Sequence, residues 1–533
     1  MLDKLLSYLR TSWEDLIFFG LLLAASALLM FELTSLFVAP IADSYLWWGD
    51  ESWLMTEFRT QMLTGVFRHP YALSSSLAHG SGLIFGNMWL TAALYGLPAT
   101  LAKSSDVVMI GRTVTALLSV TLAFVLYECI RKLSGERLLA LFGVIVLVTS
   151  RSFLLTSHSA RYDILSALAI LVGVAMAMMH LHIHIGKRSA FLAGLSIAAT
   201  LLISVHVVLA LGLAALVVVH VRSQAKAWST GLFLLGVATI GIILYLLSHI
   251  IGIPSVNTTS GSFALNIHDI PALRLFSRSV QIANLLQRWS TITSFAFGYV
   301  ILAALVLLLT VVRGIRKSGR LNIPAWTWLI VIVLLSWLEL ESAAPTSYLI
   351  YILPVLSLGI ALTLKATTSK GIASSIVVLC SAAMFYFAFH DSWQARKNGL
   401  LLTRANDDAI GAASAEIEQD TTHPLVLAFN PAVHRLMTDS AIRLMTTHFI
   451  EFPISIVPVD SILRSEHVRY VLVYRSALKP DYMREVEPIT NAAKRAGTLV
   501  WERTSAILTD VGRSYFDTSM SGHDTLRVYK IRE

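Results

Sequence analysis

Two adjacent carboxylates, Asp50 and Glu51, follow the first long apolar segment of the 533-residue chain. A carboxylate held at a membrane surface can act as a general base, and a neighbouring acid shifts its pKa. The same two residues also fit a simpler interpretation, in which they are solvated loop charges. An interfacial belt of tryptophans would then surround them, formed by Trp47, Trp48 and Trp53. The residue types alone leave both interpretations open.

A second group of ionisable residues surrounds a short turn between two apolar segments, and it contains Arg151, His158, Arg161 and Asp163. Ionisable groups at membrane depth are costly, which favours a functional role. In that interpretation Arg161 and His158 hold an anionic group while Asp163 orients a hydroxyl. Alternatively, Asp163 only caps the helix that begins there, because the helix dipole favours a carboxylate at that position.

Three further residues are predicted to lie at the same depth. His206 is in the middle of the run 189–221, which contains no Asp, Glu, Lys or Arg. His79 precedes the apolar segment 82–102, and Tyr348 begins another apolar segment. Each of the three is also explained as an ordinary packing or interfacial residue.

The sequence contains no strong metal-binding pattern. His180, His182 and His184 alternate, and residues two apart do not share a helix face, so they are expected to be interfacial. The acid pair could hold a divalent ion but does not require one. There is no P-loop and no dinucleotide-binding fingerprint. We therefore expect no required cofactor and no metal site.

The composition defines the elements that position these residues. Hydrophobic residues make up 56% of the chain, charged residues 14%, and the mean hydropathy is +0.69. Soluble domains carry about 25% charged residues, so a soluble enzyme, a disordered protein and a fibrous protein are excluded. Residues 391–533 hold 17 basic and 18 acidic residues, and the rest of the chain holds 24 and 15. No water-exposed basic surface for nucleic acid is concentrated anywhere.

The apolar segments predict an α-helical polytopic membrane protein with about eleven transmembrane helices. The run 189–221 is too long for one span and is divided into two. With a cytoplasmic N-terminus, the basic residues that flank the spans face inside. A further span at 82–102 would reverse this pattern, so we expect a juxtamembrane helix there, kinked near Pro98. The remaining spans are expected near 16–39, 107–129, 138–155, 164–182, 229–250, 291–312, 324–342, 346–364 and 371–390.

Two domains follow from this topology. Residues 1–390 form the membrane domain, with outer loops at about 40–106 and 251–290, and residues 391–533 form an α/β domain. The protein is expected in the inner cell membrane, with the outer loops and the α/β domain on the extracytoplasmic side. Within the α/β domain, strands are expected at 425–430, 470–475, 498–503 and 525–531, and helices at 431–449 and 480–496.

The order of these motifs resembles the GT-C membrane glycosyltransferases, in particular the branch of protein mannosyltransferases and aminoarabinose transferases. The resemblance covers roughly residues 10–390. It is carried by the acid pair, by the His79 segment, and by the stretches 111–137, 159–171, 193–213 and 347–356. Family members often carry prolines after the histidine, whereas Gly80-Ser81-Gly82 follow His79 here.

The resemblance implies an inverting transferase that moves a sugar from a polyprenyl-phosphate donor to a lipid, glycan or protein acceptor at the outer membrane face. It implies Asp50 as general base, with Glu51 and Asp163 orienting the acceptor or sugar. The leaving phosphate would be held by Arg161, His206 and Tyr348. The loop 251–290, with Arg274 and Arg278, would close over the donor.

The alternative is a transporter or flippase of a lipid-linked or anionic substrate. Transporters tend to have internal repeats and polar breaks at the bilayer midplane. This sequence has neither, and its ionisable residues gather at the predicted outer face, so the transferase is favoured.

Overall fold

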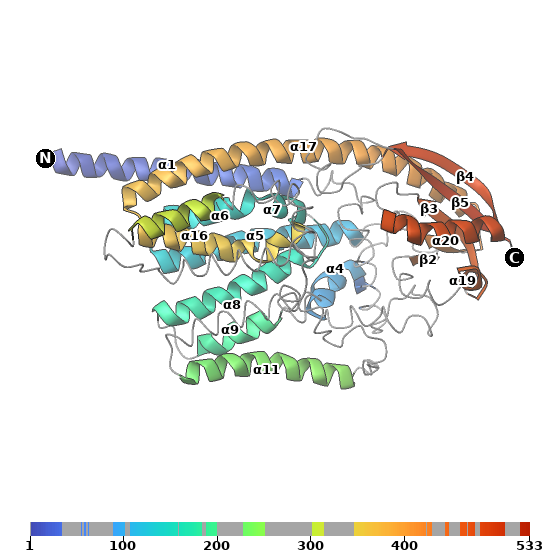
Figure 1. Cartoon of the computed structure of the whole chain (residues 1–533), viewed down its shortest axis with the longest axis horizontal. Helices are drawn as coiled ribbons and strands as arrows, with labels where there is room; N and C mark the ends of the chain where they lie inside the picture. The colour runs from blue at the N-terminus through green and yellow to red at the C-terminus, as the bar shows by residue number, and fades with distance from the viewer. Residues whose placement is uncertain are drawn as a thin grey trace.

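The computed structural model describes the following residues: 2–34, 55, 58, 59, 62, 89–101, 107–157, 159–183, 188–199, 227–250, 301–313, 346–422, 424–428, 443–446, 459–465, 467–474, 480–506 and 523–532. A bundle of helices forms one end of the molecule and a small β-sheet forms the other (Figure 1). The N-terminus of the first helix lies at the end of the bundle farthest from the sheet.

Three of the described helices are long and apolar enough to cross a membrane. The candidate spans are Trp13–Thr34 in α1 (Leu2–Thr34), Val107–Ser134, which is α5, and Lys370–Lys397 in α17 (Lys370–Glu418). Shorter apolar stretches are α6 (Arg137–Val148), Asp163–Met179 in α8 (Asp163–Ile183), Gly231–Ile240 in α11 (Ala227–Ile250), Ile301–Arg313 and α16 (Leu353–Thr367). Helix α9 (Arg188–Ala198) follows α8. The protein is thus a helical membrane protein, and the count of eleven spans remains a prediction.

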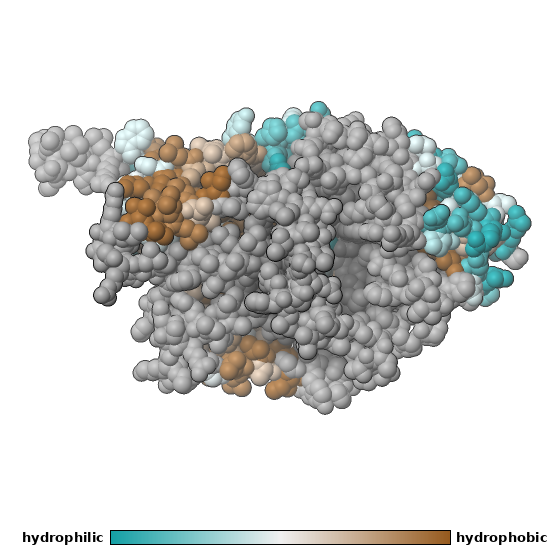
Figure 2. Space-filling model, viewed as in Figure 1, coloured by the Kyte–Doolittle hydropathy of each residue, from teal (hydrophilic) through white to brown (hydrophobic). Residues whose placement is uncertain are grey.

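The surface of the molecule separates apolar from polar residues along its long axis. Figure 2 shows hydrophobic residues gathered on the bundle and hydrophilic residues over the sheet. Leu16, Phe19 and Leu379 are among the exposed apolar side chains of α1 and α17. Exposure of this kind is expected for helices that face lipid.

Helices α1 and α17 run side by side in the same direction (Figure 1). Lys370 pairs with Glu14 near their starts, and Arg396 donates a hydrogen bond to Thr34 further along. The rings of Phe31 and Trp393 stack at 6.5 Å between the two polar contacts. These contacts fix the register of α17, which continues beyond the bundle toward the sheet.

The expected span at 138–155 is interrupted in the structure. Helix α6 ends at Val148, and a separate helix α7 (Arg151–Thr156) follows. The Ser150 hydroxyl accepts a hydrogen bond from the backbone N–H of Phe153, which caps α7. A serine with this geometry ends one helix and starts the next, because it satisfies a donor that has no partner inside the helix. The expected span at 346–364 likewise begins as a 3-10 helix, η7 (Thr346–Tyr351).

The expected juxtamembrane helix is described from Trp89 to Leu101. It consists of α3 (Trp89–Thr91), the π-helical turn η2 (Ala92–Gly96) and α4 (Leu97–Thr100), so its irregularity precedes Pro98. One face is buried in the protein, with Tyr95 packed among Met55, Phe58 and Tyr162. At Gly96 a side chain would meet the backbone of Phe58, so the close approach of these two segments requires glycine.

The C-terminal sheet has five described strands in the order β2-β1-β3-β5-β4. They are β1 (Leu425–Ala428), β2 (Arg443–Thr446), β3 (Val468–Tyr474), β4 (Gly497–Ala506) and β5 (His523–Ile531). Strand β1 pairs parallel with β2 and β3, and β5 pairs antiparallel with β3 and β4. Helices α19 (Val459–Ser465) and α20 (Pro480–Ala496) complete this part.

The four predicted strands and the predicted helix 480–496 are present. The helix expected at 431–449 is wrong for residues 443–446, which form strand β2. Four residues are too few for the hydrophobic periodicity to distinguish a strand from a helix, and the pairing with β1 decides their conformation. Helix α17 passes without a break through residues 390 and 391, where the sequence places the domain boundary.

Candidate functional site

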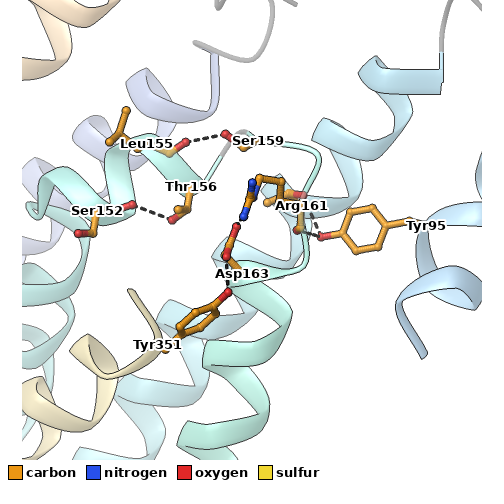
Figure 3. A network of polar contacts seen from close by, with 9 residues as sticks. Tyr95, Ser152, Leu155, Thr156, Ser159, Arg161, Asp163 and Tyr351 are labelled. Carbon is orange, nitrogen blue, oxygen red and sulfur yellow. Dashed lines mark hydrogen bonds and ion pairs between the residues drawn. The ribbon is translucent and has the colours of Figure 1, made fainter. Parts of the chain in front are cut away.

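The turn between α7 and α8 holds a buried cluster of charged and phenolic side chains. The Arg161 Nε lies 2.7 Å from Oδ2 of Asp163, the first residue of α8. The Tyr351 hydroxyl, from η7, donates a hydrogen bond of 2.5 Å to the other carboxylate oxygen. The side chains of Arg161 and Asp163 are only 2% and 1% exposed. Figure 3 shows the three side chains meeting from two separate segments.

The backbone of this turn is held from the side by Tyr95. Its hydroxyl donates a hydrogen bond of 2.6 Å to the carbonyl oxygen of Arg161 (Figure 3). The same hydroxyl lies 2.9 Å from the Thr115 hydroxyl on α5. Burial raises the pKa of the Tyr95 hydroxyl above its ordinary value, so the group remains a donor. The π-helical turn that contains Tyr95 is thereby connected directly to the residue that carries the guanidinium.

Serine hydroxyls brace the rest of the turn. The Ser119 hydroxyl on α5 donates to the carbonyl of Ser157 at 3.2 Å, and Ser159 donates to the carbonyl of Leu155 at 2.8 Å. On the same face of α5, a side chain at Gly111 would collide with Met55 and Ala160. The turn therefore packs closely against α5 at these positions.

This geometry defines what each buried group can do chemically. Both oxygens of the Asp163 carboxylate accept hydrogen bonds, one from the Arg161 guanidinium and the other from the Tyr351 hydroxyl. Asp163 is well placed to fix the guanidinium of Arg161. A fixed guanidinium is suited to bind a phosphate or another oxyanion through its planar set of donors.

Arg151 belongs to a different contact. Its guanidinium forms two hydrogen bonds with Asp391 on α17, Nε to Oδ2 at 2.6 Å and Nη2 to Oδ1 at 3.0 Å. The side chains are 26% and 12% exposed, so the pair is partly solvated. Because Arg151 is the first residue of α7, this pair joins the short helix before the turn to the long helix that leads to the sheet.

The comparisons with known proteins concern the fold. No protein-family model and no curated protein matches the sequence. The chain is similar to the apo structure of ArnT from Cupriavidus metallidurans, with a TM-score of 0.54 and 12% identity over 97% of this chain and 98% of that chain. It is also similar to ArnT bound to undecaprenyl phosphate, with a TM-score of 0.52 and 12% identity over 95% and 97%. The fold is that of the GT-C glycosyltransferases.

The GT-C fold confirms the resemblance expected from the sequence, and it covers nearly the whole chain. Among the described residues, no group of three or more His, Cys, Asp and Glu side chains could hold a metal ion. The buried cluster around Asp163 contains one cation, one carboxylate and one phenol.

The structure brings together two of the predicted site residues, Arg161 and Asp163, and adds Tyr351 and Tyr95. Tyr348 lies in η7 beside Tyr351, and only its backbone is described. The other predicted residues lie outside the described part of the chain: Asp50, Glu51, His79, His158, His206, Arg274 and Arg278.

Sequence reasoning noted Tyr351 only as an interfacial tyrosine that begins a span together with Tyr348, and it did not single out Tyr95. Tyrosine is common near membrane interfaces, so neither residue stands out by type. A signal was present for Tyr351, because it lies three residues after Tyr348 and such residues share a helix face. Tyr95 gave no comparable signal, since its partner Arg161 is 66 residues away.

Proposed function

We propose that this protein transfers a sugar from a polyprenyl-phosphate donor to an acceptor hydroxyl at the membrane surface. The observation that carries the proposal is the similarity of fold to ArnT, one structure of which contains undecaprenyl phosphate. The buried Arg161–Asp163–Tyr351 cluster supports it, because a departing lipid phosphate requires a fixed cation.

In the proposed reaction, Asp50 removes the proton from the acceptor hydroxyl, with Glu51 beside it. The acceptor oxygen forms a bond with the anomeric carbon from the face opposite the phosphate, which inverts that carbon. The bond between the anomeric carbon and the phosphate oxygen breaks, and its electron pair leaves with the polyprenyl phosphate. One proton is transferred to Asp50, so atoms and charge balance.

The described residues have a positioning role in this proposal. The leaving phosphate gains negative charge as the glycosidic bond breaks, so a cation fixed beside it stabilises the transition state more than the ground state. We assign that cation to Arg161. Asp163 and Tyr351 hold its guanidinium in place, and Tyr95 holds its backbone. His158, His206 and Tyr348 would contribute further donors to the phosphate, and Arg274 and Arg278 would close over the donor.

The site is proposed to face the extracytoplasmic side of the inner membrane. Labelling of single cysteines in a Cys129→Ser, Cys380→Ser background tests this placement. Lys132→Cys, at the exposed end of α5, should resist an impermeant thiol reagent added from outside, and Glu502→Cys, on strand β4, should react. Reaction of Lys132→Cys alone would reverse the orientation.

The experiment that tests the function uses the purified full-length protein in lipid nanodiscs with a panel of polyprenyl-phosphate sugars. Release of free polyprenyl phosphate, together with an inverted sugar on the acceptor, is the expected result. Asp50→Asn retains the shape of the side chain and should lower turnover by roughly 10²-fold or more, because general-base catalysis contributes about that much. Movement of an intact donor across the bilayer without cleavage would instead identify the flippase alternative.

A further inference from the structure

A cavity of about 280 Å³ lies at the end of the bundle far from the Arg161–Asp163 cluster. It is lined by residues of α1, of the turn between α5 and α6, and of the starts of α6 and α17. Lys370, which lines it, precedes Asp391 by 21 residues of α17, roughly 32 Å at 1.5 Å per residue. The cavity is thus separate from the proposed catalytic end by about the thickness of a bilayer core.

The ends of all three candidate transmembrane spans meet at this cavity. The first begins at Trp13, the second ends at Ser134 and the third begins at Lys370. Glu14, Gly135 and Lys370 line the cavity directly. A cavity in this position lies at the boundary between the hydrocarbon core and the lipid headgroups.

The cavity carries charges of both signs. Glu14, Asp15 and Glu136 are acidic, and Arg137 and Lys370 are basic. Lys370 Nζ lies 2.6 Å from Glu14 Oε2, which keeps the lysine at the rim. A surface ion pair alone contributes little to stability. Five ionisable residues of both signs thus line one small hollow, and a ligand that also carries both charges would match them.

The walls beneath these charges are apolar. Phe18, Leu138 and Leu139 line the cavity. On the adjacent surface of α1, Trp13 and Leu16 are more than 60% exposed. A molecule that fits both the charged residues and the apolar walls has a charged head and a hydrocarbon tail. The tail would lie along the exposed face of α1.

We propose that this cavity binds the headgroup of a zwitterionic phospholipid that carries a primary ammonium group. Its phosphate would lie against Arg137 and Lys370, and its ammonium would donate hydrogen bonds to Asp15 and Glu136. A quaternary ammonium cannot donate such bonds, so a choline lipid fits less well. A glycerol headgroup leaves the carboxylates without a cation, so an anionic lipid also fits less well. The site is independent of the proposed transfer reaction.

The test uses the full-length protein in detergent, titrated with short-chain phosphatidylethanolamine, phosphatidylcholine or phosphatidylglycerol, with bound lipid measured by native mass spectrometry. The ethanolamine lipid should bind most tightly. Arg137→Ala and Asp15→Asn should each weaken its binding by about tenfold, since each removes a charge-assisted hydrogen bond. Lys132→Ala is the matched control, because Lys132 is exposed in the last turn of α5 and does not line the cavity.

Four results would overturn the proposal. Equal binding of the three lipids would show that the headgroup is not recognised. Unchanged binding in both cavity variants, or an equal loss in Lys132→Ala, would place the lipid elsewhere. Displacement of the lipid by inorganic phosphate at comparable concentration would identify a site for a free anion. None of these results depends on whether the protein transfers a sugar.

Discussion

Two arginines of one short stretch, Arg151 and Arg161, each pair with an aspartate, yet the two pairs have different roles in the structure. Arg161 and Asp163 are two residues apart and almost fully buried, and Tyr351 donates a hydrogen bond to Asp163. Arg151 and Asp391 are 240 residues apart and partly exposed, and they join two helices. The local pair fixes the orientation of one cation, whereas the distant pair fixes the placement of helix α17.

The difference follows from what surrounds each pair. A buried ion pair requires every charged group to be satisfied, because water is not available to compensate a missing partner. Removing one member of the Arg161–Asp163 pair therefore leaves an uncompensated charge. Removing one member of the Arg151–Asp391 pair leaves a charge that water can reach. The same substitution should thus have unequal effects at the two places.

The largest effect is expected for Asp163→Asn. The change retains the shape of the side chain but removes the negative charge that pairs with the buried Arg161, which should destabilise the protein by about 3–5 kcal/mol. Denaturant unfolding of detergent-purified protein would measure the loss. Asp460→Asn is the control, because its pair with Arg495 is exposed. Equal stability of the two variants would contradict the assignment of a buried pair.

Tyr351→Phe should have the next largest effect. The change removes the hydrogen bond to the Asp163 carboxylate but keeps the ring and the ion pair. A hydrogen bond to a charged group contributes about 1.5–3 kcal/mol, so a loss in this range is expected by the same unfolding measurement. Tyr386→Phe on α17, whose ring is 71% exposed, is the matched control and should be neutral.

A smaller effect is expected for the distant pair. A double-mutant cycle of Arg151→Ala and Asp391→Ala should give a coupling energy of about 1–2 kcal/mol, because the pair is bidentate but partly solvated. A coupling energy of 3 kcal/mol or more would contradict the expected difference between the partly solvated pair and the buried pair.

The smallest effect concerns the far end of α17. A hydrogen bond from Thr422 lowers the pKa of Asp420 below its ordinary value. The stability that this carboxylate contributes is therefore present above its unfolded pKa of about 3.9 and is lost as the pH falls through the lower folded value. Asp420→Asn should remove that part of the acid dependence in unfolding measured between about pH 6 and pH 2. An unchanged acid profile in Asp420→Asn would show that the carboxylate does not contribute.

The sequence predicted the main helices and four strands, since long apolar runs and alternating segments carry clear periods. It also predicted that Arg161 and Asp163 lie at one turn. It did not predict the break at Ser150, because an N-cap serine inside an apolar run resembles any other small residue. Nor did it predict that Arg151 would pair with Asp391 on α17 instead of joining the cluster at the turn. A contact across 240 residues depends on how the helices pack.

The predicted roles of Arg161 and Asp163 were separate, one for the phosphate and one for the acceptor. The structure instead pairs the two side chains directly. Residue types and depth in the membrane can indicate that two ionisable groups belong to one region. They do not indicate which two groups form a hydrogen bond or an ion pair, because these partners depend on side-chain orientation and on neighbours such as Tyr95 and Tyr351.

The most direct test of the account compares Arg161→Lys with Arg151→Lys. Both variants keep the positive charge and should fold, but a lysine cannot offer the planar donors that a guanidinium presents to a phosphate. The rate of polyprenyl phosphate release from a polyprenyl-phosphate sugar, per folded protein, is the quantity to measure. We predict a decrease of about tenfold or more for Arg161→Lys and less than about twofold for Arg151→Lys. Equal rates in the two variants, or a larger loss in Arg151→Lys, would contradict the account.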